Sequence, residues 1–459
     1  MYKLDATLKT PLHIQLYKAI KDDIVTNYSV GEKLPSIRKV ASLYNISKTT
    51  VESAYTQLYA EGVIDSQPKR GYFVADIFYM QTPSQNRHNT QQITQNYKYD
   101  FFPAQLKKED FPQKIFKRLC NKVLSEDIEF GAYGDGQGEK ELREAIAHYL
   151  QSLRGVQCSS KQIVICSGFS DAMGLLAKLL RKKYTHFGME EPGYHVARKV
   201  FQEYGYKIEP IAVTHDGVSL EALQNAQVKL LYTTPSHHYP TGVSIPLAKR
   251  LKLLEYSNTQ DGLIIEDDYD SELVYYNRSI PSLQGLDTNE RVVYIGTFAK
   301  SLSPALRVSY MVLPTFVLEL YKQSYDAHFP RVDIITQKTL ALFMQEGHWE
   351  RHLRKIRTLN KKKHHHFKQL LQKYLKDTFT IKAEGAGLAI LIYPKEPSFD
   401  LQKLQKLAEN KGIKLYLAKE RSGGNFEALR MGFGGFGLDE LEDAVREFAE
   451  VWERCLEKS

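Results

Sequence analysis

Between residues 162 and 298, short apolar runs alternate with amphipathic segments, and this alternation limits the possible folds. The runs are QIVICSG, THFGME, LLYTTP, LIIEDDY and VVYIGTF. Apolar runs of this length predict buried strands, and the amphipathic segments between them predict helices. Strands that alternate with helices favour a mostly parallel sheet with helices packed on it. The larger part of the chain is therefore predicted to be an α/β domain.

A polar segment from Asp76 to Lys98 divides the chain into a small head and a larger body. It contains TPSQNRHNTQQITQNYK, which is rich in Gln, Asn and Thr and poor in aliphatic residues, as linkers often are. A chain of 459 residues is also long enough for several domains. We predict a head at 1–75, a linker at 76–98, a large domain with an N-terminal arm at 99–325, and a smaller α+β lobe at 326–459. The last of these follows from long helical patterns and the strand-like IKAEGAGLAILIYP.

The composition excludes some classes of protein and leaves others open. No apolar run reaches the ~18–20 residues of a membrane helix, and MYKLDATLKTPL lacks the apolar core of a signal peptide. Cys120, Cys158, Cys166 and Cys455 form no CxxC pair, which favours buried thiols in a reducing cytosol. We therefore predict a cytoplasmic protein without membrane contact. The formal net charge of +8 permits nucleic-acid binding without showing it.

Residues 361–366 read KKKHHH and have two interpretations. Three histidines beside three lysines look like a metal or polyanion site. A solvated face of the helix that includes RHLRKIRTLN is the interpretation preferred here, because charge runs are usually solvated. No histidine has metal-ligand spacing from two cysteines. No metal site is predicted.

The head has the pattern of three helices followed by a hairpin. In PLHIQLYKAIKDDIV, apolar residues recur at helical spacing from Leu12 to Ile24. Ser36 can cap a short second helix, SIRKVASLY, and Ser47 can cap a third. VIDSQ and YFVA then predict two short strands around the basic turn PKRG.

The start of the third helix has the chemistry of a DNA-contacting turn. SKTT offers short hydroxyls and one cation beside a positive helix N-terminus, which suits contact with phosphates and groove edges. An arginine opens the preceding helix, and two basic residues occupy the wing turn. For SKTT alone, a capped surface helix with an incidental basic turn is the alternative. The predicted contacts are Arg38, Ser47, Lys48, Thr49, Thr50, Lys69 and Arg70.

Lys300 lies in GTFAKSLSPALR, at the end of the apolar run VVYIGTF. A lysine at a strand end can point into a cleft, where burial lowers its pKa towards that of a neutral, nucleophilic amine. Asp267 and Tyr269, two residues apart in LIIEDDYD, face the same side of a strand. An acid at the end of an apolar strand needs a charged or hydrogen-bonded partner, and a protonated pyridine nitrogen would serve. Asp268 and Asp270 are predicted to be turn or helix-capping acids.

Elements that bind anions and flat rings accompany this lysine and acid. In SGFSDAMGLLAKLL, small polar residues begin a helix whose N–H groups form an anion site. Thr297 and Arg307 flank the lysine and are suitable phosphate partners. Tyr194 follows a Pro-Gly turn and can stack on a ring, while Arg430, in LRMGFG, can hold a carboxylate. Each element alone is explained by a cap or a turn, but together they fit pyridoxal phosphate.

Two long stretches resemble known families. LPSIRKVASLYNISKTTVESAYTQLYAEGVIDSQPKRGYFV resembles the GntR-type winged helix, with Lys48 where that family usually has Arg. The order of EPGY, PTG, EDDYD and GTFAKSLSPALR resembles fold type I aminotransferases over residues 99–459. A GntR head on such a body is similar to the MocR/GabR family of bacterial regulators. The resemblance implies a multidomain protein. Its N-terminal winged helix-turn-helix precedes an α/β fold type I transferase-like body with a smaller α+β C-terminal lobe.

The resemblance also implies roles for individual residues. Lys300 is the internal aldimine lysine, Asp267 the partner of the pyridine nitrogen, and Arg430 the group that binds an α-carboxylate. Tyr269 reaches the ring oxygen, and Tyr194 stacks on the ring. The remaining cofactor positions are Thr297, Arg307, Gly168, Phe169 and Ser170 at the phosphate, Tyr239 near the ring oxygen, and Tyr133 at the neighbouring subunit's phosphate. In the head, the family's DNA contacts match Arg38, Lys48, Thr49, Thr50 and the wing glycine Gly71.

Three departures from the aminotransferase pattern bear on activity. Tyr239 replaces the usual Asn, and Phe169 and His195 differ from the common residues at their turns. Because the winged helix is complete and the catalytic surround is not, we predict a regulator with little or no steady transamination, and the resemblance implies that it is a homodimer. It would bind a double-stranded DNA operator and sense an amino compound by aldimine exchange at Lys300. The alternatives are an active amino-acid aminotransferase with a DNA-binding head and a dimerisation scaffold without cofactor.

Overall fold

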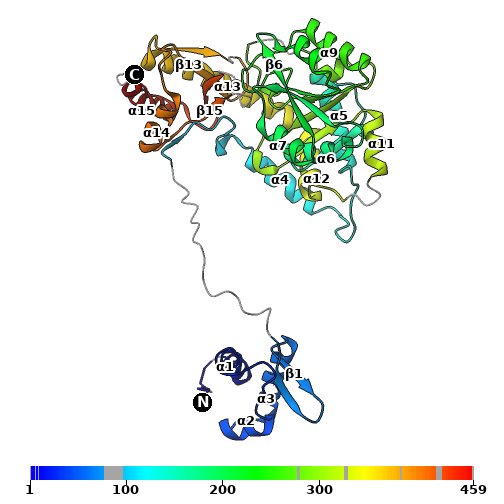
Figure 1. Ribbon diagram of the computed structural model, residues 1–459, viewed down its shortest axis with the longest axis vertical. Helices are drawn as coiled ribbons and strands as arrows, with labels where there is room; N and C mark the ends of the chain where they lie inside the picture. The colour runs from blue at the N-terminus through cyan, green and yellow to red at the C-terminus, as the bar shows by residue number, and fades with distance from the viewer. Residues whose placement is uncertain are drawn as a thin grey trace. The chain divides into compact units, whose positions relative to one another are not determined.

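The computed structural model describes residues 2–5, 7–8, 10–76, 97–276, 280–324, 329–382, 385–419 and 426–456. The chain forms two compact units, Met1–Gln95 and Asn96–Ser459, and each is described here by itself (Figure 1). Most of the predicted linker, residues 77–96, lies outside the described residues. The predicted boundaries at 75, 98 and 325 stay predictions.

The first unit has the elements of a winged helix. They are α1 (Leu12–Asn27), α2 (Ile37–Tyr44), α3 (Lys48–Ala60) and the antiparallel strands β1 (Ile64–Gln67) and β2 (Gly71–Val74). Both predicted caps form: the hydroxyls of Ser36 and Ser47 accept hydrogen bonds from the N–H groups of Lys39 and Thr50, at 3.3 and 3.1 Å. Asn45 turns the chain between α2 and α3 in the left-handed conformation, with φ at 52°. The sequence signals therefore fix the helix-turn-helix geometry locally.

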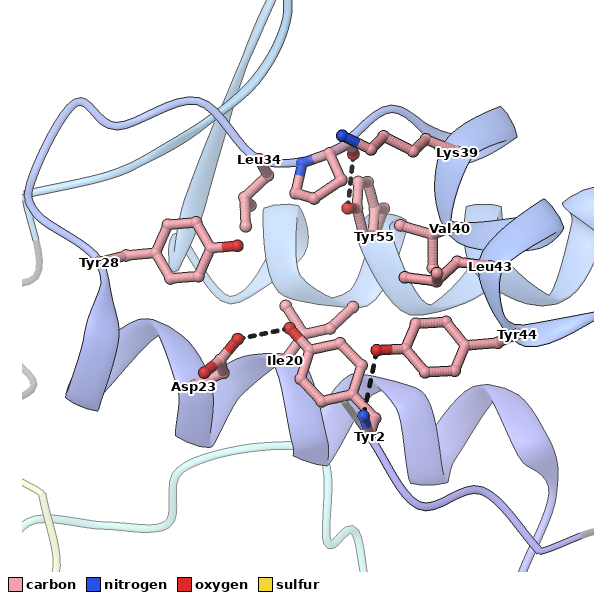
Figure 2. A pocket seen from close by; sticks show the side chains of 11 residues that line it. Tyr2, Ile20, Asp23, Tyr28, Leu34, Lys39, Val40, Leu43, Tyr44 and Tyr55 are labelled. Atoms are coloured by element: carbon pink, nitrogen blue, oxygen red, sulfur yellow. Dashed lines mark hydrogen bonds between the residues drawn. The ribbon is translucent and has the colours of Figure 1, made fainter.

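A cavity of about 200 Å³ lies in the head between α1, the loop before α2, and α2 itself (Figure 2). Tyr2 closes one side: its hydroxyl donates to Asp23 at 2.6 Å, and its backbone N–H donates to the Tyr44 hydroxyl at 3.0 Å. On the other side the hydroxyl of Tyr55, from α3, donates to the Pro35 carbonyl at 2.7 Å. These bonds tie the start of the chain and the loop before α2 to the three helices.

An eight-stranded sheet forms the centre of the second unit. Its strands are β4 (Ile163–Cys166), β5 (His186–Glu191), β6 (Lys207–Thr214), β7 (Gly217–Val218), β8 (Leu230–Thr233), β9 (Leu263–Asp267), β10 (Val292–Thr297) and β11 (Ser309–Val312). The spatial order is β4-β11-β10-β9-β8-β5-β6-β7, and only β11 and β7 run antiparallel to their neighbours. The predicted mostly parallel sheet is confirmed.

Helices pack on both faces of this sheet (Figure 1). They include α4 (Gln113–Leu124), α5 (Lys140–Arg154), α6 (Phe169–Leu180), α7 (His195–Glu203), α8 (Leu220–Ala226), α9 (Leu247–Thr259), α10 (Leu283–Leu286), α11 (Thr315–Gln323) and α12 (Ile334–Gln345). Along β10, the side chains of Val293 and Ile295 join the core under α6, whereas Tyr294 joins the core under α5. Alternate strand residues therefore face two different cores. Helix α12 packs against α4 and α5, so the chain after residue 325 first completes the large lobe.

The smaller lobe is a four-stranded antiparallel sheet with three long helices. Its strands β12 (Phe379–Lys382), β13 (Ala389–Pro394), β15 (Leu417–Lys419) and β16 (Glu427–Gly432) follow the order β12-β13-β16-β15. Its helices are α13 (His348–Leu375), α14 (Leu401–Asn410) and α15 (Leu438–Leu456). The N-terminal arm joins this lobe, because β3 (Tyr99–Asp100) pairs with β14 (Ile413–Lys414). Four 3-10 turns complete the elements, at Lys108–Asp110, Ser160–Gln162, Ser271–Leu273 and Pro304–Leu306.

The KKKHHH run lies on α13, and the predicted solvated face is wrong for two of its residues. Lys363 and His364 are buried, since α13 turns them towards the lobe core. Lys363 forms an ion pair with Asp110 at 3.3 Å and donates to the Gly434 carbonyl at 2.9 Å. Within the described ranges, no group of three or more His, Cys, Asp or Glu residues is placed to hold a metal. No helix of the described residues is long and apolar enough to cross a membrane.

Candidate functional site: the carboxyl edge of the sheet and the head

The predicted cofactor residues gather at the carboxyl ends of parallel strands, the edge where α/β sheets usually bind ligands. Asp267 ends β9, and Lys300 follows β10. Tyr239 follows β8, Tyr194 follows β5, and Gly168 joins β4 to α6. The parallel strands thus bring five distant stretches of sequence to one edge.

Lys300 lies near Tyr269, with its Nζ 5.6 Å from the centroid of the tyrosine ring. Burial, helped by the positive charge of Arg430, lowers the pKa of Lys300 to about 8, although the Asp270 and Asp267 carboxylates act in the opposite direction. A lysine with this pKa is partly neutral near neutral pH. The neutral amine is the nucleophilic form.

Asp267 is a buried acid with a neutral partner. Tyr232, on the adjacent strand β8, donates a hydrogen bond to Asp267 Oδ2 at 2.6 Å. Burial raises the pKa of Asp267 to about 7, although the bond from Tyr232 lowers it. A cation brought to this carboxylate would offset its desolvation, and a pyridinium N–H group is such a cation.

The start of α6 and Arg307 form an anion cradle. Gly168 precedes Phe169, the first residue of the helix, and has a φ of 83°. A Cβ on Gly168 would lie 2.7 Å from Arg307 Cζ, so a side chain there would displace the guanidinium. Ser170 is exposed in the same first turn, and Thr297 ends β10 close to the arginine's loop. A helix N-terminus beside a guanidinium is an arrangement that binds phosphate.

Tyr194 and Tyr239 form an aromatic wall. Their ring centroids are 5.1 Å apart, and Phe169 lies 5.3 Å from Tyr194. Arg430, on β16 of the smaller lobe, places its Cζ 4.4 Å from the centroid of Tyr239. At the position where the resemblance expects Asn, Tyr239 therefore holds the predicted carboxylate-binding guanidinium by a cation–π contact.

The charges at this edge fit a ligand with two anionic groups and one cationic ring nitrogen. In the part of the chain that the structure describes, Lys300, Arg307 and Arg430 form no ion pair, and Asp267 is bonded to a neutral hydroxyl. Charges without an ionic partner are costly where they are buried, as Asp267 and Arg430 are, whereas Arg307 is exposed. The phosphate and pyridinium of pyridoxal phosphate, together with a carboxylate from an amino compound, would supply the missing partners. The residues present therefore fit this cofactor.

The sequence prediction missed the partners of the other acids that follow β9. Arg154, at the end of α5, forms an ion pair with Asp268 at 2.7 Å, and Tyr294 donates to the same carboxylate at 2.6 Å. His237 contacts Asp270, Nδ1 to Oδ2, at 2.7 Å. Both acids are buried. Asp270 does precede the 3-10 turn Ser271–Leu273, as a turn acid would, but its side chain makes no capping hydrogen bond and binds His237 instead. No spacing rule in the sequence points to Arg154. His237, in contrast, stands in the strand-end turn TPSHHYPTG, and a polar residue at a strand end is a candidate site residue.

Tyr133 lies apart from these residues. Its side chain is 79% exposed, and its ring centroid is 4.1 Å from that of Phe329. Among the described residues, no hydrogen bond, ion pair or ring contact joins it to the cluster around Lys300 in its own chain. Its role at the phosphate of a neighbouring subunit stays a prediction.

In the head, the predicted DNA-contacting side chains lie on α2, on α3 and in the wing turn. Those on α3 are in its first turn, where the Ser47 and Thr50 hydroxyls are 2.8 Å apart. The wing turn bends sharply, with φ at 62° for Lys69 and 111° for Gly71. The exposed members of the set are Arg38, Ser47, Lys48, Thr49, Lys69, Arg70 and Gly71. Cations at a helix N-terminus and in a wing suit contact with a phosphate backbone.

Comparison with known proteins matches both units. Residues 12–74 match the family "Bacterial regulatory proteins, gntR family", and residues 96–423 match "Aminotransferase class I and II". The chain is 34% identical over 465 residues to the uncharacterized HTH-type transcriptional regulator YdeL of Bacillus subtilis, covering 98% of each chain. It is 32% identical over 414 residues to the probable rhizopine catabolism regulatory protein MocR of Rhizobium meliloti, covering 85% of this chain and 83% of that one.

The chain belongs to the MocR-type regulators, which join a GntR head to an aminotransferase class I and II body. The body has the fold of LysN, an α-aminoadipate aminotransferase from Thermus thermophilus solved with N-(5'-phosphopyridoxyl)-L-leucine. The TM-score is 0.69 at 22% identity, covering 80% of this chain and 94% of that one. The predicted fold class, DNA-binding regulatory function and pyridoxal phosphate cofactor are confirmed at the level of the family. The roles of single residues stay predictions.

Proposed function

We propose that this MocR-type regulator senses a small amino compound that carries a carboxylate, at the site around Lys300. One observation carries the proposal: among the described residues, the buried Asp267, the buried Arg430 and the amine of Lys300 form no ion pair. A purely structural cluster of this kind would destabilise the fold without gain. A ligand that supplies the opposite charges gains binding energy from the same arrangement.

Each residue has a distinct part in this proposal. Pyridoxal phosphate, when bound, supplies an aldehyde that combines reversibly with amines. Lys300 is the chain's own amine for that aldehyde, and its pKa of about 8 keeps part of it neutral. Asp267 holds the ring nitrogen, and the start of α6 with Thr297 and Arg307 holds the phosphate. Tyr194 lies against the ring. Arg430 takes the carboxylate of the amino compound that competes with Lys300.

Arg430 would bring the effector into contact with both lobes of the body. It lies on β16 of the smaller lobe, whereas Lys300 follows β10 of the larger lobe. An effector bound to both would therefore bridge the two lobes. It changes DNA binding only if it binds one arrangement of the protein more tightly than another. We propose a homodimer in the cytoplasm as the active form, since paired heads suit paired half-sites on DNA.

The test is DNA binding by the purified protein, using the DNA upstream of its own gene. Binding is measured without cofactor, with pyridoxal phosphate, and with the cofactor plus a panel of amino acids and amines. We expect sequence-preferring binding whose affinity changes with at least one compound that also changes the visible absorbance of the cofactor. Absence of sequence-preferring binding in every condition would refute the proposal.

An amino-acid aminotransferase is the second candidate function. It is favoured by the lowered pKa of Lys300, because an amine that titrates near neutral pH can act as a general base. Steady conversion of an amino acid and a 2-oxo acid, measured over many turnovers, would establish it. A single half-reaction, with no second turnover, would support the regulator instead.

A further inference from the structure

His237 and Asp270 form a buried pair beside Tyr269, and the proposed function gives this pair no role. His237 lies in the turn after β8, and Asp270 lies three residues after the end of β9. Their side chains are 7% and 4% exposed, and Nδ1 of the histidine lies 2.7 Å from Oδ2 of the acid. The imidazole and the Tyr269 ring are nearly parallel, at 26°, with centroids 6.2 Å apart. The pair thus packs against the tyrosine whose ring centroid lies 5.6 Å from Lys300 Nζ.

The hydrogen-bond chemistry fixes the direction of donation. A carboxylate only accepts, so Nδ1 of His237 carries the proton that it shares with Asp270. The Tyr269 hydroxyl lies 3.4 Å from the same Nδ1. Because that nitrogen already carries a proton, the hydroxyl cannot donate to it, and the tyrosine proton stays available for another acceptor. Burial and the Asp270 carboxylate raise the pKa of Tyr269 well above its usual value, so the tyrosine stays protonated.

The second ring nitrogen of His237 argues against a role in packing alone. Nε2 is buried and has no hydrogen-bond partner in the described part of the chain. A buried polar atom without a partner costs about 1–3 kcal/mol. An apolar ring of similar size would fill the same space without that cost. The imidazole is therefore better explained by what Nδ1 does.

The smaller lobe holds the pair in place. A Cβ on Gly387 would lie 2.7 Å from Asp270 Oδ2 and 3.1 Å from His237 Cε1, so this turn covers the pair closely. The Gly387 N–H donates to the Leu273 carbonyl at 2.9 Å, and the Tyr275 N–H donates to the Gly385 carbonyl at 2.7 Å. These backbone bonds fix the turn to the segment that follows Asp270. The pair is thus clamped between the lobes that the effector is proposed to bridge.

We propose that His237 and Asp270 are positioning residues that direct the hydroxyl of Tyr269 towards the ring oxygen of pyridoxal phosphate. The inference rests on the proposed function, because it needs the cofactor at this site. A hydroxyl that donates to the ring oxygen competes with the proton of the attached Lys300 nitrogen for that oxygen. The pair therefore lowers the pH at which that nitrogen loses its proton.

The test uses the full chain loaded with pyridoxal phosphate and follows the visible absorbance of the cofactor against pH. We expect H237F and Y269F each to raise the pH midpoint by about one unit, a tenfold change in the equilibrium. The double variant H237F/Y269F should show no further rise, because both changes act through one hydroxyl. H237N, whose amide can donate to Asp270, should recover most of the wild-type midpoint.

H238N is the matched control. His238 is also buried and is bonded to Thr241 at 2.6 Å, and among the described residues no hydrogen bond, ion pair or ring contact joins it to Tyr269. It should leave the midpoint unchanged. An unchanged midpoint in H237F, or a further rise in the double variant, overturns the inference. If H237F does not fold, the pH midpoint of H237A is measured instead, and the same rise is expected. A wild-type protein that shows no cofactor absorbance at all refutes the proposed function instead, so the two failures are distinguishable.

Discussion

The head and the body of this regulator use charge in opposite ways. In the head, Arg38, Lys48 and Arg70 are exposed, so water solvates them before any DNA arrives. In the body, Asp267 and Arg430 are buried, and neither forms an ion pair among the described residues. Exposed charges cost the fold little, whereas buried unpaired charges cost a great deal. The body thus holds an electrostatic imbalance that a ligand can relieve, and under the proposed function that relief would supply the free energy for a switch.

The largest expected effect comes from Lys300→Ala. Loss of the only amine proposed to hold the cofactor should abolish the amine-dependent absorbance change and the response of DNA binding to amines. DNA binding without an amine should stay within about twofold of wild type, a free-energy change below ~0.5 kcal/mol. Spectroscopic titration and electrophoretic mobility shifts measure the two effects. If amines still modulate DNA binding in this variant, the sensing site lies elsewhere.

Two arginines separate structural charge from ligand-binding charge within the body. Arg154 is paired with Asp268 and buried, so Arg154→Met should lower the free energy of unfolding by about 3–5 kcal/mol. Arg430 has no acidic partner among the described residues, so Arg430→Met should leave the stability of the cofactor-free protein equal to or above wild type. Urea unfolding of both variants measures this difference. Equal destabilisation by both would mean that Arg430 has a structural partner after all.

The sequence predicted the elements of this molecule better than it predicted their contacts. The winged helix follows from local signals: Ser36 and Ser47 cap their helices, and Asn45 makes the turn between them. In the body, the strand-end positions of Lys300 and Asp267 follow from the apolar runs that predict the strands of the sheet. A parallel sheet brings strand ends together, so their clustering is a consequence of topology.

What the sequence did not show depends on packing between distant segments. Arg154 lies 114 residues before its partner Asp268, and no pattern joins them. On α13 the KKKHHH run was predicted to be solvated, but the contact with Asp110 buries Lys363. Whether a helix face is solvated or buried depends on the segments that pack against it, and the local sequence does not identify those segments. Buried polar pairs are therefore the part of such a site that needs the structure.

Asp267 makes the stability of the cofactor-free body depend on pH. Its folded-state pKa of about 7 lies above the usual pKa of 3.8 of an aspartate in an unfolded chain, so the folded state holds the proton more tightly. The stabilisation is complete below the unfolded value and is lost as pH rises through about 7, by roughly 4 kcal/mol at most. In Asp267→Asn this part of the decline should vanish. Thermal unfolding of both proteins between pH 4 and pH 8 measures it.

Bound cofactor sharpens the same prediction. A pyridinium nitrogen beside Asp267 favours the ionised carboxylate, so the cofactor should stabilise the wild-type protein more above pH 7 than below it. The variant, which cannot ionise at this position, should show a smaller gain that depends less on pH. A stability decline in the variant equal to that of wild type would assign the pH dependence to other buried acids, such as Glu272, whose pKa burial also raises to about 7.

The smallest expected effect concerns one exposed cation in the head. Lys48 opens α3 and is exposed, so Lys48→Ala should weaken operator binding by about 1 kcal/mol, roughly fivefold, and should lower the slope of affinity against salt by about one ion. The stability of the protein should stay within ~0.5 kcal/mol, because an exposed side chain with no ion pair stabilises little. Lys18→Ala, an exposed lysine on α1, is the matched control and should change neither quantity.

Since a phosphate contact carries no base information, binding of the Lys48→Ala variant to unrelated DNA should weaken by the same factor. Selective weakening on the operator would instead assign Lys48 to a base edge, and the head would then read sequence through the same exposed turn that it uses for affinity.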